Sequence, residues 1–213
     1  MLPPEDRHVY HFTHMRNLPS VLDQGCVNCD RIVREDGSLR VECGDRDIKE
    51  RRRSRKVDPP PGGVVADYVP FYFAPRSPML YKISKGSVPT YADGQDPLIY
   101  LVTTPRRLAA AGCDSVFSDG NCAADITAIE GDLTLLGSHV DWPVMRLERW
   151  NNTSEDPDRM RRRMAEFLVY ERVPVTAVIH LAVRRQSRAD AVRQLLSSHG
   201  CTLDVVVRPT WYY

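Results

Sequence analysis

Short apolar segments, each bounded by polar or turn-forming residues, divide most of the chain into expected strands. Several are rich in Val, Ile, Tyr and Phe, the residues that favour strands. They are residues 9–13, 68–73, 99–102, 178–183 and 203–207, with shorter runs at 116–119 and 167–170. The pattern therefore predicts a protein built around a β-sheet.

Helical signals lie between these segments. Asn17 is a suitable N-cap, Leu18, Val21 and Leu22 form one apolar stripe, and Gly25 ends it, which predicts a helix over about 17–24. Further helices are expected at about 104–111, 157–164 and 188–199. Because strands and helices do not alternate regularly, the pattern favours an α+β fold. No linker divides the chain, so we expect a single domain over 1–213.

Two long stretches lack periodicity and are predicted to be loops. Residues 26–47 mix Gly, Asp, Glu and Arg, and residues 130–155 carry scattered Trp and charge. Loops of this length in a compact domain usually have a function or are mobile.

Composition narrows the class of protein. Hydrophobic residues are 42% and charged residues 27% of the 213, which is typical of a globular chain. No apolar run approaches the roughly 18 residues that span a bilayer, so no membrane segment is expected. Six cysteines and an acidic start without a signal peptide predict free thiols and a cytoplasmic location.

Charge is clustered although the net charge is only +1. Six of the eight residues in 49–56 are basic, and a second cluster comprises Arg159 and 161–163. Trp142 and Trp150 lie between the clusters in sequence. Cations near aromatic rings suit single-stranded nucleic acid, whose bases stack on the rings. The alternative is that each cluster is a solvated surface.

Two polar features on expected strands are candidates for chemistry. His11 and Thr13 share one face of the first strand, because side chains alternate with period two, while Phe12 faces a core on the other side. They could hold a ligand's amide or ribose hydroxyl, or His11 could be a satisfied buried histidine. Glu166 precedes a strand, where its carboxylate is expected at the mouth of the fold and could stabilise a developing cation. Glu171 is the competing carboxylate.

Several common sites are absent from the sequence. It contains no Gly-x-Gly-x-x-Gly, no Gly-Lys-Ser/Thr phosphate loop and no Gly-x-Ser-x-Gly elbow. Cys26, Cys29 and Cys43 have spacing that hints at zinc, but a tetrahedral site needs a fourth ligand that the sequence does not clearly supply. Incidental thiols are favoured, and no metal is expected.

The order of these pieces resembles the DarT family. The resemblance rests on the run from Tyr10 to His14 with Asn17-Leu18, the Arg-rich run, and three further blocks. They are Tyr-Val-Pro-Phe-Tyr-Phe-Ala-Pro-Arg-Ser-Pro-Met (68–79), Phe-Ser-Asp-Gly-Asn (117–121) and Ala-Glu-Phe-Leu-Val (165–169). It covers about residues 9–185, and the first and last of these three blocks are long and unusual.

The resemblance implies a fold and an activity. The fold is an ADP-ribosyltransferase-like split mixed sheet, in which about 118–163 form a substrate-recognition loop. The activity is that of a toxin, expected to be a monomer, that transfers ADP-ribose from NAD to N3 of thymidine in single-stranded DNA. Its partner is a macrodomain antitoxin, DarG, that removes the mark.

Residue roles also come from the resemblance. Glu166 and Arg52 are the implied catalytic pair, with Arg52 preferred to Arg51 by the spacing Ile48-x-x-x-Arg52. The implied NAD contacts are His11, Phe12, Thr13, Asn17, Ser20 and Arg52. The candidates for DNA contact are Arg51, Arg76, Asn121 and Trp150. The alternatives are an NAD-dependent transferase or phosphotransferase acting on RNA and a non-enzymatic basic module that binds single strands.

Overall fold

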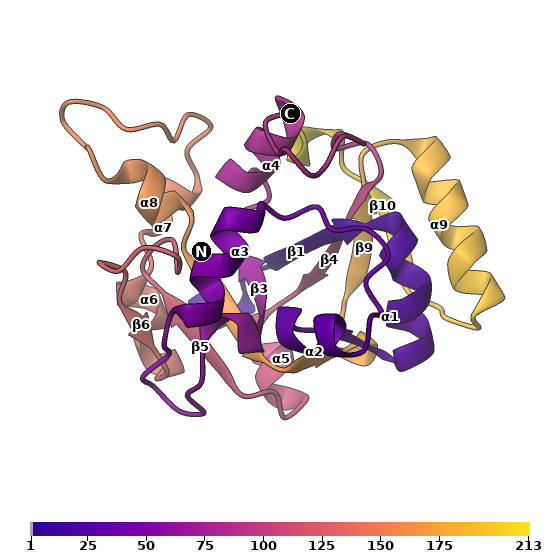
Figure 1. The fold of residues 1–213 in the computed structure, drawn as a ribbon, viewed down its shortest axis with the longest axis horizontal. Helices are drawn as coiled ribbons and strands as arrows, with labels where there is room; N and C mark the ends of the chain where they lie inside the picture. The colour runs from indigo at the N-terminus through magenta and orange to yellow at the C-terminus, as the bar shows by residue number, and fades with distance from the viewer. Residues whose placement is uncertain (1) are drawn as a thin grey trace.

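The computed structural model describes residues 2–213 and has an eight-stranded mixed sheet at its centre (Figure 1). The strands lie in the order β10 (Asp204–Val207), β9 (His180–Val183), β4 (Leu98–Thr103), β1 (Val9–His14), β3 (Tyr68–Tyr72), β7 (Glu166–Tyr170), β5 (Ser115–Ser118) and β6 (Ile129–Glu130). β10 and β9 are parallel, and all the other neighbours are antiparallel. The expected α+β class is confirmed.

The sheet opens between its two central strands. β1 pairs with β4 through six residues and β3 pairs with β7 through five, but β1 and β3 share only the pair Tyr10 and Tyr72. Beyond that pair, His11 Nδ1 lies 2.8 Å from the carbonyl oxygen of Pro70. Because two neighbouring strands that part leave backbone groups unpaired, side chains and ligands can enter between them.

The helices predicted from the sequence are present. They are α1 (Leu18–Gln24), α5 (Pro105–Ala110), α8 (Arg159–Arg163) and α9 (Gln186–Ser198). Gly25 ends α1 with φ of +67°, a left-handed conformation that favours glycine. Within residues 2–213 no helix is long and apolar enough to cross a bilayer.

The stretch 26–47 is more regular than expected. It contains β2 (Cys26–Asn28) and α2 (Asp30–Glu35), and α3 (Arg46–Ser54) begins at its end. β2 pairs with β8 (Arg172–Pro174) in a separate two-stranded sheet. β2 has only three residues, and its partner strand lies more than 140 positions away in the sequence. Such a strand has almost no local sequence signal, which explains why residues 26–47 were wrongly predicted to be a loop.

Two further expectations are corrected. Residues 130–155 contain the end of β6, α6 (Leu136–His139) and α7 (Trp142–Met145), and four residues of this stretch join the main core, namely Leu136, Val140, Trp142 and Met145. α4 (Pro78–Ser84) was not predicted, although Ser77 caps it by accepting from the Leu80 amide and Pro78 occupies its first position. Of the predicted loop 130–155, the part that follows α7 is irregular up to α8 and is seen in orange in Figure 1.

Two apolar layers cover the sheet. One includes the fully buried rings of Phe71, Phe117 and Phe167, and the other joins Leu80 of α4 to Tyr100 of β4. The C-terminal segment completes the second layer, because the buried Tyr212 hydroxyl lies 3.0 Å from the carbonyl oxygen of Leu98 and 3.2 Å from that of Ala182. In Figure 1 the C-terminus accordingly lies beside α4.

A cleft with a buried arginine–glutamate pair

A single cavity collects the residues for which NAD contact was predicted. His11, Phe12, Thr13, Asn17, Ser20 and Arg52 all line it, together with Glu166. Its walls come from β1, α1, α3, β3 and the start of β7. The cavity therefore lies at the opening between β1 and β3.

Arg52 and Glu166 meet inside this cavity. Arg52 Nη1 donates to both carboxylate oxygens of Glu166, at 2.8 and 2.9 Å. The Glu166 side chain is only 3% exposed and that of Arg52 13%. Glu166 was expected at the mouth of the fold, and the structure corrects this, because residue 166 is the first residue of β7 and pairs with Tyr72 of β3. The two charges stabilise each other where water is largely excluded.

The local sequence sets the direction of Arg52. The Asp45 carboxylate caps α3 by accepting from the amides of Asp47 and Ile48. Four residues separate Ile48 from Arg52, so both lie on one face of the helix, and both line the cavity. Arg51 points elsewhere and is exposed, which agrees with the choice of Arg52 from the sequence spacing.

The electrostatics of the cleft keep Arg52 as the cation. Burial is the largest single effect and lowers its pKa, but the neighbouring groups, chiefly the Glu166 carboxylate, together raise it more, and the net pKa lies above the usual arginine value. Burial raises the pKa of the neighbouring Tyr72 and Cys122, and the charge of Glu166 raises both further. Both groups are therefore neutral at pH 7. Arg52 Nη2 is buried and has no hydrogen-bond partner among residues 2–213, so it is a free donor inside the cavity.

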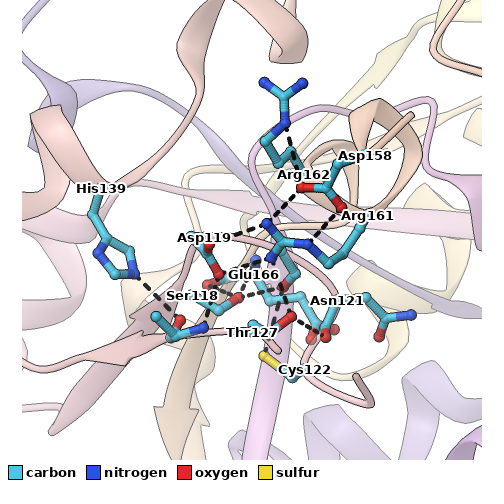
Figure 2. A network of polar contacts seen from close by, with 12 residues as sticks. Ser118, Asp119, Asn121, Cys122, Thr127, His139, Asp158, Arg161, Arg162 and Glu166 are labelled. Atoms are coloured by element: carbon cyan, nitrogen blue, oxygen red, sulfur yellow. Dashed lines mark hydrogen bonds and ion pairs between the residues drawn. The ribbon is translucent and has the colours of Figure 1, made fainter. Parts of the chain in front are cut away.

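Glu166 is positioned by the turn that follows β5. The backbone amide of Glu166 donates to Ser118 Oγ at 3.0 Å, and Ser118 Oγ donates to the Gly120 carbonyl oxygen at 2.7 Å. Figure 2 shows Arg161 above this turn, between Asp119 and Asp158. A Cβ at Gly120 would clash with the Arg161 guanidinium, so a larger residue there would require Arg161 to move away from Asp119 and Asp158.

Most of the basic run 49–56 is occupied by internal contacts. Lys49 pairs with Asp30 and Glu42, and Arg53 pairs with Asp30 and Glu50. Arg52 holds Glu166, and Arg55 donates to backbone carbonyls. Arg51 and Lys56 are the exposed members without an ion pair among residues 2–213. The run is therefore not a continuous surface of free cations, and Lys56 lies beyond the end of α3.

The second basic cluster is neutralised in the same way, with one exception. Arg159 pairs with Asp156, Arg161 with Asp119 and Asp158, and Arg162 with Asp141, Asp156 and Asp158. Arg163 is buried, and no described residue forms an ion pair or hydrogen bond with it. α8 is thus attached to the turn after β5 and to α7 by alternating Arg and Asp side chains.

His11 and Asn17 take part in the wall of the cavity in different ways. Burial lowers the pKa of His11, against the opposing effect of its hydrogen bond to the Pro70 carbonyl, so the ring is neutral and donates from Nδ1. Asn17 is 4% exposed, and protein groups satisfy its amide. Its Nδ2 donates to Thr13 Oγ1 and the Val41 carbonyl, and its Oδ1 accepts from the amides of Arg40 and Val41. Asn17 therefore fixes the 40–41 segment.

The four DNA candidates separate into three places. Asn121 lines the cavity beside Met164, and Arg51 is on the outer side of α3. Arg76 and Trp150 do not line the cavity but meet at the C-terminal segment. Arg76 donates to the Tyr212 carbonyl oxygen, and Trp150 Nε1 donates to Tyr213 Oη at 3.0 Å.

Some cavity residues were missed in the sequence. Tyr68, Pro70 and Tyr72 all line it, and their period-two spacing against the apolar Val69 and Phe71 is a signal that predicts a shared face. Cys122 does not line the cavity but lies beside Glu166, and it was missed because this contact joins segments 44 residues apart. The rival Glu171 does not line the cavity, since it pairs with Arg31 at 2.7 Å.

Cys26, Cys29 and Cys43 also line the cavity as free thiols. Burial raises the pKa of each, that of Cys43 to about 12, so they are protonated at pH 7. Among residues 2–213 no group of three or more His, Cys, Asp and Glu side chains is arranged to hold a metal ion.

Known proteins share this whole architecture. The family model described as "ssDNA thymidine ADP-ribosyltransferase, DarT" matches residues 10–213. A DNA ADP-ribosyl transferase of Mycobacterium tuberculosis is 36% identical over 213 residues, covering 99% of this chain and 90% of that protein. A transferase–glycohydrolase fusion protein of Thermosipho africanus is 24% identical over 210 residues, covering 99% of this chain and 50% of the fusion.

Solved structures of the Thermus sp. 2.9 DarT superpose on the full chain. The complex with ADP-ribosylated ssDNA has a TM-score of 0.92 at 32% identity, covering 100% of this chain and 99% of that one. The complex with NAD+ has a TM-score of 0.88 at 31% identity, covering 100% of both. The sheet and its cleft are those of an NAD-dependent ADP-ribosyltransferase that acts on DNA. Within that class, the chain belongs to the DarT family of ssDNA thymidine ADP-ribosyltransferases.

Asn17→Ala tests the clamp on the 40–41 segment. The substitution leaves two backbone amides and a carbonyl without their buried partners, so the free energy of unfolding should fall by about 2–4 kcal/mol. Urea denaturation measures this loss, and NAD titration should show weaker binding because the adjoining segment lines the cavity. Asn17→Asp keeps the acceptor and should lose less; parental stability in Asn17→Ala would contradict the clamp.

His11 makes the stability depend on pH. The unfolded state takes up its proton near pH 6.5, whereas the folded state takes it up only at lower pH. Stability is therefore complete above about pH 6.5 and decreases as the pH falls below it, by at most about 1.4 kcal/mol per pH unit for one histidine.

The measurement is urea denaturation at several pH values between 7.5 and 5.5. His8, His14 and His180 also have lowered pKa values, so the parental slope includes their contributions. His11→Gln should retain that background and lose its own part. An identical slope in the variant would show that His11 is not held neutral by the fold.

Proposed function

We propose that Arg52 and Glu166 form the catalytic centre at which the chain transfers ADP-ribose from NAD+ to N3 of thymidine in single-stranded DNA. The observation that carries the proposal is the buried contact between Arg52 Nη1 and both Glu166 oxygens inside the cavity. The likeness to the Thermus protein solved with NAD+ and with ADP-ribosylated ssDNA supports it. The opening between β1 and β3 is then the split of the ADP-ribosyltransferase fold, and the whole chain acts as one catalytic domain.

The walls of the cavity suit a dinucleotide. His11 has Nε2 as an acceptor once Nδ1 donates to Pro70, and Thr13 and Ser20 add hydroxyls. The unpartnered Nη2 of Arg52 is a buried cationic donor, which suits a diphosphate oxygen or a polarised base carbonyl. Asn17 supports this wall through the 40–41 segment rather than through a free amide group.

Glu166 has a clear task in breaking the bond between nicotinamide and ribose. As that bond breaks, its electron pair leaves with nicotinamide, and positive charge develops on the ribose. A carboxylate beside the ribose stabilises this charge and orients a ribose hydroxyl, as carboxylates do in glycoside cleavage. The low exposure of Glu166 strengthens the effect, because little water screens it.

Arg52 acts on the acceptor without exchanging a proton. Its pKa is above the usual arginine value, so it cannot serve as a base. Its charge instead stabilises the negative charge that the thymine ring carries as N3 loses its proton to Glu166 and bonds to the ribose. In a duplex N3 is engaged in pairing, and exposing it costs a few kcal/mol, which favours a single strand.

The proposed partner is a macrodomain antitoxin of the DarG kind. The fusion of a DNA ADP-ribosyl transferase with a DNA ADP-ribosyl glycohydrolase in the Thermosipho protein supports this pairing. The segment 118–163 is the proposed substrate-recognition region, because its turn at 118–121 contacts Glu166 through Ser118 while its outer part is exposed.

Glu166→Gln tests the catalytic carboxylate. Incubation with NAD+ and a thymidine-containing oligonucleotide should add the mass of one ADP-ribose with the parental protein. The rate should fall about 100- to 1000-fold in the variant, because a charge that stabilises the transition state is lost. Mass spectrometry measures the transfer, and an RNA oligonucleotide of matching sequence and a DNA duplex are the controls.

Loss of folding must be separated from loss of chemistry. Glu166→Gln leaves the Arg52 charge without its partner and should lower the thermal midpoint, whereas the double variant Arg52→Met/Glu166→Leu should recover stability and remain inactive. Transfer at the parental rate by Glu166→Gln would contradict the assignment, and binding of DNA without any mass gain by the parent would favour a non-enzymatic binding module.

Arg51 and Arg52 provide a matched pair. Arg52→Gln should reduce kcat at saturating oligonucleotide by at least about 100-fold, because its donor faces the reacting groups. Arg51→Gln removes the same charge from the exposed side of α3 and should keep kcat within about twofold, with any effect confined to KM for DNA. Steady-state kinetics measures both parameters, and a larger loss of kcat at Arg51 would reverse the two assignments.

A further inference from the structure

The cleft divides the main sheet into two halves. The β1 half contains β10, β9, β4 and β1, and the β3 half contains β3, β7, β5 and β6. In the described part of the chain, Tyr10 and Tyr72 are the one residue pair of the ladder between β1 and β3. His11 and Glu166 both line the cavity but come from different halves. Their separation therefore depends on what holds the two halves together.

One connection lies at the open end of the cleft, where β1 has parted from β3. Tyr68 and Tyr170 pair at this end, four residues along β3 from the pair of Tyr72 with Glu166. β8 follows β7 here, and β2 follows α1, which is attached to β1. β2 and β8 pair over three residues, so they join the two halves at the open end.

The segment before β1 lies at the other end, where Tyr10 and Tyr72 pair, which we call the closed end. It contains a 3₁₀ turn, η1 (Pro4–Asp6), followed by Arg7. Glu5 and Asp6 form ion pairs with Arg106 of α5, and α5 directly follows β4. These ion pairs attach the turn to the β1 half.

Arg7 and Pro4 contact the β3 half instead. The Arg7 guanidinium carbon lies 4.0 Å from the ring centroid of Trp142, which begins α7 in the segment after β6. Burial and the charge of Arg146 lower the pKa of Arg7, but the usual arginine value is high enough that Arg7 stays a cation and makes a cation–π contact. Pro4 lies beside α6, since a Cβ added at Gly137 would be 3.3 Å from Pro4 Cγ.

Trp142 connects this contact to the start of β7. Its side chain is buried, and its ring packs edge to face on Phe73, with the centroids 5.3 Å apart. Phe73 directly follows β3 and packs edge to face on Phe167, the residue after Glu166, at 6.4 Å. No described residue accepts a hydrogen bond from Trp142 Nε1, so packing and the Arg7 contact hold the indole ring.

We propose that Arg7 is a positioning residue for NAD+, because its contact with Trp142 joins the two halves of the sheet at the closed end and so fixes Glu166 relative to His11. This inference rests on the proposed function, since NAD+ is the occupant of the cleft. Arg7 does not line the cavity and acts through Trp142 and Phe73. Without the contact, part of the binding free energy of NAD+ would be used to order the two walls, and the affinity would fall.

Arg7→Ala tests the positioning role through NAD+ binding. Isothermal titration calorimetry without DNA, well below the thermal midpoint of each variant, should show an affinity about fivefold lower than that of the parent, within the range of a cation–π contact. In steady-state transfer, KM for NAD+ should rise by about the same factor, whereas KM for the oligonucleotide should stay within about twofold. A purely structural role would change neither constant at this temperature.

Two further variants give the rescue and the control. Arg7→Lys should keep the NAD+ affinity within about twofold of the parent, because an ammonium group also binds the face of an indole ring. Arg107→Gln removes an arginine charge from α5, where Arg107 donates to the Thr176 carbonyl oxygen, and should keep the parental affinity. Failure of Arg7→Lys to restore binding would contradict the cation–π contact.

Hydrogen exchange tests the contact without any ligand. In Arg7→Ala, peptides covering 9–14 and 68–73 should exchange at least about threefold faster than in the parent, because the closed end then opens more often. Peptides covering 26–28 and 172–174 should exchange at the parental rate, since the pairing of β2 with β8 is a separate connection.

The two readouts separate this inference from the proposed function. Parental exchange at the β1–β3 boundary in Arg7→Ala would show that Arg7 does not join the halves, whatever happens to NAD+ affinity. Faster exchange with parental NAD+ affinity would make Arg7 purely structural and would contradict the positioning role. Faster exchange in a protein whose parent neither binds NAD+ nor adds ADP-ribose would leave the connection between the halves in place and overturn the proposed function.

Discussion

The contact between Arg52 and Glu166 is the interaction on which the site depends. Each side chain lies where water is largely excluded, so neither charge is stable there without the other. α3 must therefore pack against the start of β7, and the turn after β5 must hold the backbone of residue 166 through Ser118. This carboxylate and its cation are in this way built into the folding of the sheet, and their geometry is fixed before any substrate binds.

The opening between β1 and β3 is the complementary constraint. A sheet paired along its whole length would fill this space with backbone hydrogen bonds, whereas one shared pair, Tyr10 with Tyr72, keeps the strands together and lets them part beyond it. β4 and β7 support the two strands from outside through longer ladders. The cleft can therefore remain open in a stable sheet, because each half is anchored independently.

Most basic side chains of the two clusters form ion pairs within the fold, although their grouping in the sequence suggests a surface for nucleic acid. Aspartates and glutamates neutralise most members of both clusters, which agrees with a net charge of only +1. These pairs attach α3 and α8 to the turns around the cleft. The positive groups left for DNA are then few and local, so selectivity depends on where each one lies and not on an extended field.

The sequence by itself determined seven of the eight strands of the main sheet, the four helices α1, α5, α8 and α9, and the family. Alternating apolar residues and capping signals act over a few neighbours, and long motifs such as 68–79 and 165–169 need no structure to be compared. The spacing from Ile48 to Arg52 also places both residues on one face of α3, because helical period is a local property. The residues for which the resemblance predicts NAD contact all line one cavity. Tertiary structure alone decided the rest. The pairing of β2 with β8, the burial of Glu166, the contact of Cys122 with it and the isolation of Arg163 depend on which distant segments meet. Burial and ion pairing arise from contacts between segments that are distant in the sequence, so a local sequence pattern cannot predict them.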